Sequence, residues 1–549
     1  MEAEVKDEGE DEEKKSDAGE AVNPYSYLER DEFTTEIFKI EINHPKQYGT
    51  AQLKKRLQSL DLKPSKVKVI TRERLSFVTF RCEEDREKAL EVLQGHKWMG
   101  KNMKVKRARA AADPMLRKRK HEAGELNDAV TPWWNITYQD QLKKKNADMK
   151  EYIRKLGKII EHNNPLMKKK LIEIRYNNDG LCCQLDEVVA SPIEKGYRNK
   201  AEFTIGKSVD GIDKTVGFRL GQYRSGNLCV VEPEKCLNIP PQTIQTAKMI
   251  QDYLRLQSEY CALDPESKVG HWMTATVRTN SQNEVTAMLQ FHPQALSQDE
   301  LLAEEEKLRS FFLSPVGKET QEQLKIISFF LLFQSDRHDG AKPSLSSRFL
   351  FHEQLTVHDT LTFRVSLDAF FQVNTPAAER LYSQVAELCG GGASSTVLDV
   401  CCGTGTIGLS IAKQVEQVVG IEMCPDAVKD AKHNAEINGI TNAEFHCGKA
   451  EELLPWMIRR YGNKEVVAVV DPPRAGLHNS VVLAIRKSAF VKRLVYVSCK
   501  PTAALNNLTD FTRAQSNRVK GQPFTVTKAV PVDLFPLTPY CELILLLER

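Results

Sequence analysis

The feature of this sequence that most restricts its fold is a glycine-rich turn between a buried strand and a helix. Thr396–Cys401 (TVLDVC) has the composition of a buried strand, and CGTGTIG from Cys402 leads from it into a helix. The next strand, Val418–Glu422, ends in an acid 19 positions after Gly403. A strand, turn, helix and strand in this order predict a parallel α/β sheet with a ligand at the carboxyl ends of its strands.

The turn also indicates which cofactor the sheet binds. It lacks the third glycine of a dinucleotide motif and the lysine of a P-loop, which disfavours NAD and nucleoside triphosphates. Gly403 and Gly405 let a ligand approach the backbone closely, and Glu422 has the spacing of a carboxylate that binds ribose hydroxyls. S-adenosylmethionine (SAM) has a ribose but no phosphate, so it fits this pattern.

Two later strands end in chemically useful residues. Val466–Asp471 leads into Asp-Pro-Pro-Arg, where the prolines stiffen the loop and Asp471 either hydrogen-bonds a flat heterocycle or caps a turn. The apolar run from Leu494 ends at Cys499, which is followed by Lys500 and a proline. Cys499 is therefore either a nucleophile, whose thiolate Lys500 could favour, or a small apolar residue. Strands near residues 525–530 and 542–547 predict a closing hairpin.

The first third of the chain has a different organisation. Residues 1–32 are acidic, with ten acids and three bases among the first 20 residues, and are predicted to be disordered. Residues 33–108 predict the order βαββαβ, a ferredoxin-like domain that resembles an RNA recognition motif (RRM). Phe77 keeps one stacking aromatic of that motif, whereas Leu75 and Lys39 stand where the other two are expected. Phe77 and Lys39 are candidate RNA contacts, and the alternative is a module that binds protein or supports the fold.

Residues 109–170 predict a basic linker with a helix around residues 149–161. Residues 141–170 carry ten Lys or Arg against three acids, a composition that suits contacts to an RNA backbone. The basic runs 104–109 and 117–120 fit either a bipartite nuclear signal or a phosphate-binding arm. Residues 171–365 predict a β-rich α+β domain for RNA binding, with strands at the ranges 173–176, 201–205, 216–220, 274–279, 285–290 and 325–332, and a helix at 298–311.

The composition disfavours several other classes of protein, such as membrane, secreted and metal-cluster proteins. No apolar run approaches the roughly 20 residues of a membrane span, and the acidic N-terminus is unlike a secretory or mitochondrial leader. We therefore expect no membrane partner and a location in the cytosol, with the nucleus as an alternative. The 13 cysteines contain no CxxC, so neither a metal nor an iron–sulfur cluster is expected. Net charge is +3, and because the first 20 residues hold −7 the remainder holds +10, which indicates a polyanionic partner.

Five ordered motifs together resemble RNA uracil-5-methyltransferases of the TrmA/RumA type. They are FFQVN from Phe370, CGTGTIG, DPPR, VYVSCKP and FPLTPYCE from Phe535, and YRNKAEF from Tyr197 also matches. The sequence departs from the family at Lys500, where bacterial members have Asn, and at Cys401, where an aromatic is frequent. The cluster cysteines of the family's rRNA-modifying branch are absent, which favours a tRNA substrate.

The resemblance implies a class I, Rossmann-like SAM-dependent methyltransferase domain at residues 366–549, behind the α+β and RRM-like domains. It implies methylation of uridine C5, at uridine 54 of the tRNA T-loop, with other uridine-containing RNAs open as further partners. Cys499 would add to C6, Glu542 would remove the C5 proton, and Asp471 would orient the uracil. Arg198 and Lys200 are candidate RNA contacts, and the expected SAM-binding residues are Gln372, Cys401, Gly403, Gly405, Thr406, Glu422 and Asp471.

Burial beside Leu543 and Ile544 would raise the pKa of Glu542 and strengthen it as a base. Two other functions stay open at this point. Asp-Pro-Pro-Arg also resembles the motif of enzymes that methylate exocyclic amines without a covalent step. A tRNA-binding or tRNA-folding factor on a methyltransferase scaffold is the second alternative.

Overall fold

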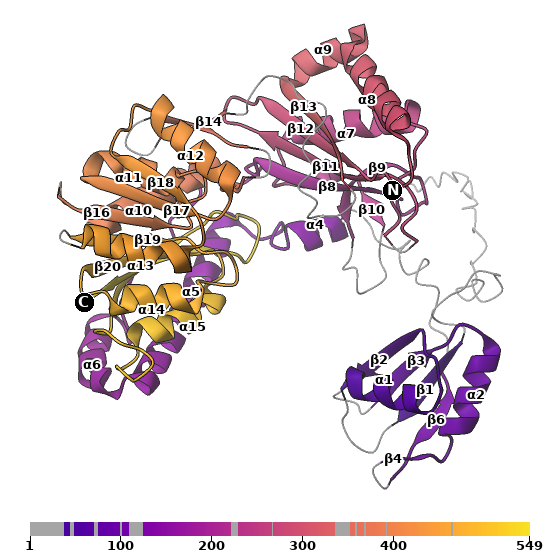
Figure 1. The fold of residues 1–549 in the computed structure, drawn as a ribbon, viewed down its shortest axis with the longest axis horizontal. Helices are drawn as coiled ribbons and strands as arrows, with labels where there is room; N and C mark the ends of the chain where they lie inside the picture. The colour runs from indigo at the N-terminus through magenta and orange to yellow at the C-terminus, as the bar shows by residue number, and fades with distance from the viewer. Residues whose placement is uncertain are drawn as a thin grey trace, which may run out of the picture. The chain divides into compact units, whose positions relative to one another are not determined.

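A computed structural model describes residues 38–43, 49–70, 75–98, 101–108, 124–220, 229–265, 267–334, 352–356, 360–366, 369–390, 392, 394–462 and 465–549 (Figure 1). The chain divides into two compact units, residues 1–121 and 122–549. The acidic segment 1–32 and the basic run 117–120 lie outside the described residues. None of the described helices combines the length and apolarity required to cross a membrane.

The first unit has the predicted βαββαβ order. Its antiparallel sheet has the order β2-β3-β1-β6, and alternate residues such as Ile40, Ile42 and Val78 face the two helices. An additional hairpin, β4–β5, precedes the last strand. The elements are β1 Lys39–Asn43, α1 Thr50–Ser59, β2 Lys66–Ile70, β3 Leu75–Thr79, α2 Glu83–Leu93, β4 Lys97–Trp98, β5 Lys101–Asn102 and β6 Lys104–Arg107.

An eight-stranded sheet organises the second unit, in the order β18-β17-β16-β19-β20-β22-β21-β7. Its first five strands are parallel and β22 is antiparallel to β20. The chain therefore reverses its strand order between β16 and β19, where ligands bind in open α/β sheets. The strands are β7 Gln184–Leu185, β16 Thr396–Val400, β17 Gln417–Glu422, β18 Ala443–Cys447, β19 Val466–Val470, β20 Val491–Ser498, β21 Thr525–Val532 and β22 Glu542–Glu548.

Helices cover both faces of this sheet. One apolar core holds side chains such as Leu381, Ile407 and Ala431, and the opposite core holds Met457 and Leu508. The parallel strands are apolar on both faces of the sheet, and the two helix layers bury these faces. The helices are α10 Thr375–Cys389, α11 Thr406–Ile411 and α12 Pro425–Ile437 on the first face, and α13 Ala450–Tyr461, α14 Asn479–Lys487 and α15 Pro501–Thr512 on the second, with short 3-10 turns at Pro165–Met167, Pro233–Lys235 and Ala412–Gln414.

The structure differs from the sequence-based expectations in three places. The helix expected around residues 149–161 is present as the longer α5 (Tyr138–Asn163), but it is not part of a linker, because it buries Tyr152, Ile153 and Leu156 against the eight-stranded sheet. Helix α6 (Lys168–Asn177) replaces the strand predicted at 173–176, and Leu171 is its buried residue. The hairpin of β14 (His352–Thr356) and β15 (Thr360–Arg364) joins the methyltransferase core rather than the central domain.

The central region has the strands predicted from residue 201 onward and the predicted helix, and it has three further helices, α4, α7 and α9, that the sequence analysis missed. Its sheet has the order β10-β9-β8-β11-β12-β13. Helix α7 packs Ile250, Tyr253 and Leu254 into the core of this sheet. The elements are α4 Gly124–Val130, β8 Lys200–Gly206, β9 Thr215–Arg219, β10 Val230–Val231, α7 Pro241–Leu256, β11 Trp272–Thr279, β12 Val285–Phe291, α8 Gln298–Leu313, α9 Pro315–Leu324 and β13 Ile326–Phe333.

Candidate active site

The glycine-rich turn after β16 adopts conformations that few side chains tolerate. Cys401, Gly403 and Gly405 all have positive φ, at 66°, 54° and 82°. A Cβ at Gly405 would lie 2.9 Å from the Phe445 ring, whereas a Cβ at Gly403 would meet nothing within 4 Å. Packing therefore requires Gly405, and Gly403 faces open space where a ligand can approach the backbone.

Two carboxylates hold this turn. Glu422 accepts hydrogen bonds from the N–H groups of Gly403 (3.1 Å) and Cys424 (2.8 Å). Asp399, buried on β16, accepts from the Gly408 N–H at 2.9 Å, and its other oxygen has no partner among the described residues. The sequence analysis named Glu422 as a ribose ligand but gave Asp399 no role.

Asp471 lies beside this turn, immediately after β19. Its N–H donates to the carbonyl of Val400, at the end of the neighbouring strand. Burial raises the pKa of Asp471 to about 7. This backbone contact places Asp471 at the carboxyl edge of the sheet, while the contact of its carboxyl group to a pyrimidine stays a prediction.

Cys499 and Glu542 lie next to each other across two paired strands. Ser498 of β20 pairs with Leu543 of β22, so the following cysteine and the preceding glutamate meet at the same end of the sheet. Cys499 is half-buried, whereas Glu542 is 2% exposed and has one oxygen without a described partner. The sheet thus brings together two residues 43 positions apart (542 − 499).

Burial raises the pKa of both groups. For Cys499, desolvation has the largest effect on the thiol pKa, the charges of Glu542 and Asp471 raise it further, and Arg474 lowers it. Desolvation followed by the charge of Asp471 raises the pKa of Glu542 well above its usual value, as the sequence predicted. The cation that opposes the rise at Cys499 is Arg474, whereas the sequence analysis had named Lys500.

Carboxyl groups accumulate at this edge of the sheet. Desolvation, aided by the charges of Asp471 and Glu422, raises the pKa of Asp399 to about 7. Together with Glu542 these acids form a cluster of closely spaced carboxyl groups beside an open glycine turn, and their mutual repulsion opposes ionisation. A cationic ligand would relieve their repulsion, and SAM carries a sulfonium and an ammonium group. The residues present therefore fit SAM, whose ribose hydroxyls also match carboxylate acceptors.

The FFQVN and YRNK motifs meet beside this cluster. Gln372 is 5% exposed, and the Asn199 side chain donates to its carbonyl at 2.8 Å. Asn374 caps α10 by accepting from the Ala377 N–H, and it donates to the Leu534 carbonyl at 3.1 Å. The Asn residues of the two motifs thus join the central region to the methyltransferase sheet.

Arg198 and Lys200 lie at the same junction. Burial lowers the pKa of Arg198, with a further decrease from the nearby charge of Arg474. The guanidinium groups of Arg198 and Arg474 are close enough to interact, and Arg474 also acts on Cys499. Together they would attract an anion near Cys499. Lys200 begins β8 and is partly exposed. RNA contacts by either residue stay predictions.

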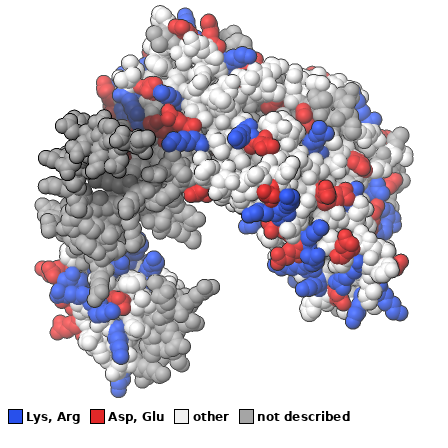
Figure 2. Space-filling model, turned by 180° about the vertical axis from the view of Figure 1, so that it is seen from behind, with Lys and Arg blue, Asp and Glu red and all other residues white. Residues whose placement is uncertain are grey.

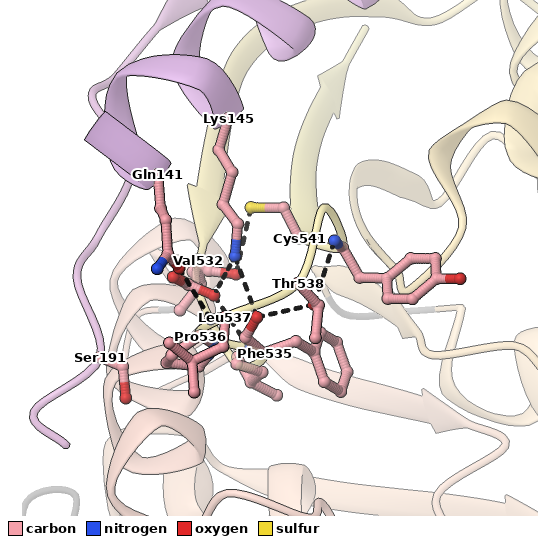
Figure 3. A network of polar contacts seen from close by, with 12 residues as sticks. Gln141, Lys145, Ser191, Val532, Phe535, Pro536, Leu537, Thr538 and Cys541 are labelled. Carbon is pink, nitrogen blue, oxygen red and sulfur yellow. Dashed lines mark hydrogen bonds and ion pairs between the residues drawn. The ribbon is translucent and has the colours of Figure 1, made fainter. Parts of the chain in front are cut away.

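The segment 533–541, which we call the base loop, leads from β21 to Glu542. Figure 3 shows Gln141 and Lys145 of α5 pointing into it. Lys145 donates to Asp533 (2.6 Å) and to the Phe535 carbonyl (3.1 Å), and both charged side chains are fully buried. Gln141 accepts from the N–H of Leu537, which has a φ of 66°. The sequence analysis missed both residues, although their spacing of four places them on one helix face with the apolar stripe.

The first unit presents its two candidate RNA contacts on one sheet face. The Lys39 ammonium lies 4.9 Å from the centre of the Phe77 ring. Glu41, opposite Phe77 on the neighbouring strand, pairs with Lys106 at 3.0 Å. The face therefore offers one aromatic surface among charged groups, and its binding of RNA stays a prediction.

Basic side chains on α5 do not form an isolated positive face. Figure 2 shows Lys and Arg interspersed with acids over the end of the second unit that carries α5 and α6. Among the described residues, no group of three His, Cys, Asp or Glu is arranged to hold a metal ion.

Comparisons with known proteins agree with this geometry. Residues 319–549 match the family model described as tRNA (Uracil-5-)-methyltransferase. The chain is 44% identical to mouse tRNA (uracil-5-)-methyltransferase homolog A over 97% of this chain and 88% of that one, and 42% identical to the human homolog A over 97% and 87%.

A solved structure shares the fold. The Pyrococcus abyssi tRNA (uracil-54, C5)-methyltransferase, in complex with S-adenosyl-L-homocysteine, aligns with a TM-score of 0.51 and 20% identity, covering 81% of this chain and 88% of that one. The extended identity to the curated relatives decides the assignment, and the chain belongs to the tRNA (uracil-5-)-methyltransferase family.

Proposed function

We propose that this protein transfers the methyl group of SAM to C5 of a uridine in tRNA, at position 54 of the T-loop, through a covalent adduct of Cys499. The observation that carries the proposal is the adjacency of Cys499 and Glu542 at the ends of paired strands. A half-buried thiol beside a buried carboxyl group supplies a nucleophile and a base on one side of a planar ring. The name of the Pyrococcus abyssi relative supports the choice of position 54.

The covalent step activates an unreactive carbon. The Cys499 thiolate forms a bond to C6, and the electrons of the C5–C6 double bond move onto O4 as an enolate. These electrons return through C5 to form the bond to the methyl group, and the methyl–sulfur bond of SAM breaks. Glu542 then takes the C5 proton, the C5–C6 double bond re-forms, and the bond to Cys499 breaks to regenerate the thiolate.

The remaining residues would bind SAM and orient the uracil. When bound, SAM supplies the electrophilic methyl group. Gly403 leaves room for it, and Asp399, Glu422 and Asp471 provide the negative surroundings that its positive charges require. Asp471 would also hydrogen-bond the uracil edge. The base must leave its stack to reach this buried edge, as other enzymes that modify bases require.

The surrounding surface would hold the RNA. Arg198 and Arg474 would attract a phosphate near the target nucleotide, and the Phe77 and Lys39 face of the first unit is a separate candidate RNA contact. We propose tRNA as the partner, with other uridine-containing RNAs as further substrates, and the cytosol or nucleus as the location.

The proposal is tested with tRNA that carries 5-fluorouridine at position 54. Fluorine cannot leave as a proton does, so the wild-type protein with SAM should form an adduct that survives denaturation. Cys499→Ser should form none and should lose at least about 10³-fold of its turnover on natural tRNA. A tRNA with cytidine at position 54 serves as the matched substrate control.

Near-wild-type turnover by Cys499→Ser would contradict the covalent mechanism. It would instead favour methylation of an exocyclic amine through Asp-Pro-Pro-Arg. Absence of SAM binding by calorimetry would favour a tRNA-binding or folding factor.

A further inference from the structure

Helix α5 contacts the loops that carry both proposed reacting groups. Its buried face has an apolar half, which lies on the sheet, and a polar half formed by Gln141 and Lys145. The Tyr152 hydroxyl, two turns beyond Lys145, donates to the carbonyl of Pro501 at 2.8 Å. Pro501 begins α15 two residues after Cys499. One rigid element thus touches the chain next to the nucleophile and the loop that ends at the base.

The contacts from α5 to the base loop include a buried ion pair, whose role is better explained by positioning the loop than by stabilising the fold. Lys145 and Asp533 are both fully buried, and a buried ion pair is weak evidence for stability because desolvation opposes its attraction. The Lys145 ammonium also donates to the Phe535 carbonyl, while Asp533 accepts from the Phe535 N–H at 2.9 Å. The pair therefore fixes the backbone path of the loop, where an apolar pair would only fill space.

Further contacts hold the same loop. Gln141 accepts from the Leu537 N–H at 2.7 Å, and its amide donates to the carbonyl of Ile136 at 2.9 Å. The Trp133 N–H donates to the Leu537 carbonyl at 2.9 Å. Both backbone groups of Leu537, a residue held at positive φ, are therefore bound by the segment around the start of α5 (Figure 3).

We propose that α5 sets the position of Glu542 relative to Cys499, with Lys145, Gln141 and Tyr152 as positioning residues. Lys145 and Gln141 act through the base loop, and Tyr152 acts through Pro501. Lys145 and Tyr152 are seven positions apart, which corresponds to about 10 Å along the helix. This inference rests on the proposed covalent mechanism, and it assigns the two contacts to different steps of it.

Different variants should slow the two steps, which are formation of the Cys499 adduct and removal of the C5 proton. Loss of the base-loop contact should slow removal of the C5 proton, so that the methylated protein–RNA adduct accumulates during turnover. Loss of the Tyr152 contact should slow formation of the adduct. A displacement of about 1 Å at a reacting group can reduce a rate by about 10²-fold.

The test uses the full chain, natural tRNA and SAM with a labelled methyl group. Lys145→Met combined with Asp533→Asn removes both charges and leaves an acceptor for the Phe535 N–H. This double variant should lower kcat by roughly 10-fold to 100-fold with KM little changed, and labelled adduct should accumulate. Tyr152→Phe should instead lower the single-turnover rate of adduct formation without accumulation.

Arg486→Met is the matched destabilisation control. Arg486 is buried and donates to the Arg513 carbonyl at 2.8 Å, and its own carbonyl accepts from Arg549 at the opposite end of β22 from Glu542. It should lower the melting temperature without accumulation of adduct. If the double variant fails to fold, Gln141→Met, which removes the acceptor for Leu537, decides the question by the same readout.

Two results would overturn the inference. One is adduct breakdown within twofold of the wild-type rate in the base-loop variants that fold, Lys145→Met with Asp533→Asn or Gln141→Met. The other is a loss of methyl transfer and adduct breakdown in equal proportion, as Arg486→Met would give, because that marks a purely structural helix. Failure of the mechanism itself differs, since the wild-type protein would then form no adduct with 5-fluorouridine tRNA.

Discussion

The glycine turn and the base loop lie at the same edge of one sheet, yet they are held in opposite ways. The turn is braced by Asp399 and Glu422, which lie 9 and 19 residues from the N–H groups they bind. The base loop is bound by Gln141 and Lys145, which lie 396 and 388 residues from their partners. The turn is therefore a local motif, whereas the base loop takes its shape from a distant helix.

The difference bears on how each region tolerates change. A local motif loses its function when its own residues are altered, because the same few residues set the backbone conformation and leave room for the ligand. A loop held from a distance fails when any of several remote contacts is lost. Substitutions that address the two regions separately should therefore give different losses of activity, SAM affinity and stability.

Glu542→Gln should produce the largest effect. Removing a general base typically costs about 10²-fold to 10⁴-fold in rate. Turnover should fall within that range while the methylated adduct accumulates, which gel analysis with a labelled methyl group would detect. Glu548→Gln, at the far end of the same strand, is the control, because its half-buried pair with Arg493 contributes at most about 1 kcal/mol. Equal losses in the two variants would argue against Glu542 as the base.

Gly405→Ala tests the local region. The substitution places a Cβ 2.9 Å from Phe445 in a residue held at φ 82°, so strain and overpacking should lower the free energy of unfolding by roughly 2–4 kcal/mol. Gly403→Ala, which points into open space, should retain most stability but lose SAM affinity. Thermal denaturation and calorimetry would separate the two. Gly392→Ala, with nothing within 4 Å, is the neutral control.

The rate should increase with pH. The pKa values of Cys499 and Glu542 are both raised above their usual values, and the reactive forms are the thiolate and the carboxylate, which higher pH favours. In the range below these pKa values, kcat/KM should rise by up to about tenfold per pH unit. Arg474→Met should move this rise to higher pH because Arg474 lowers the thiol pKa, and Lys500→Met should not. A rate independent of pH between 6 and 9 would contradict the assignment.

Phe77→Ala should have the smallest effect. A base stacked on one aromatic side chain is worth about 1–3 kcal/mol, and the low end is expected because Leu75 and Lys39 stand in place of two other rings. The KM for tRNA should rise by about fivefold with kcat unchanged. The same KM for wild type and variant would show that the first unit does not bind the substrate through this face.

Much of the fold followed from patterns along the chain. The strand ends at Cys401, Asp471 and Cys499 were predicted because apolar runs stop abruptly at glycine, proline or charge. The helix around residues 149–161 was predicted, but it was assigned to a linker because lysines dominate the composition, although the buried stripe at Tyr152, Leu156 and Ile160 has helical spacing. Residues 173–176 of helix α6 were predicted as a strand, and there Ile174 and Tyr176 alternate with charged residues.

The sequence alone singled out the groups that we propose carry the chemistry, because each sits in a short motif whose residue types depend on local backbone and reactivity. Only the tertiary structure decided that Cys499 and Glu542 are neighbours across two strands, and that Arg474 rather than Lys500 opposes the rise in the thiol pKa. It likewise decided that Lys145 is buried against Asp533. Distances between side chains far apart in sequence depend on sheet register and helix packing, which no local pattern contains.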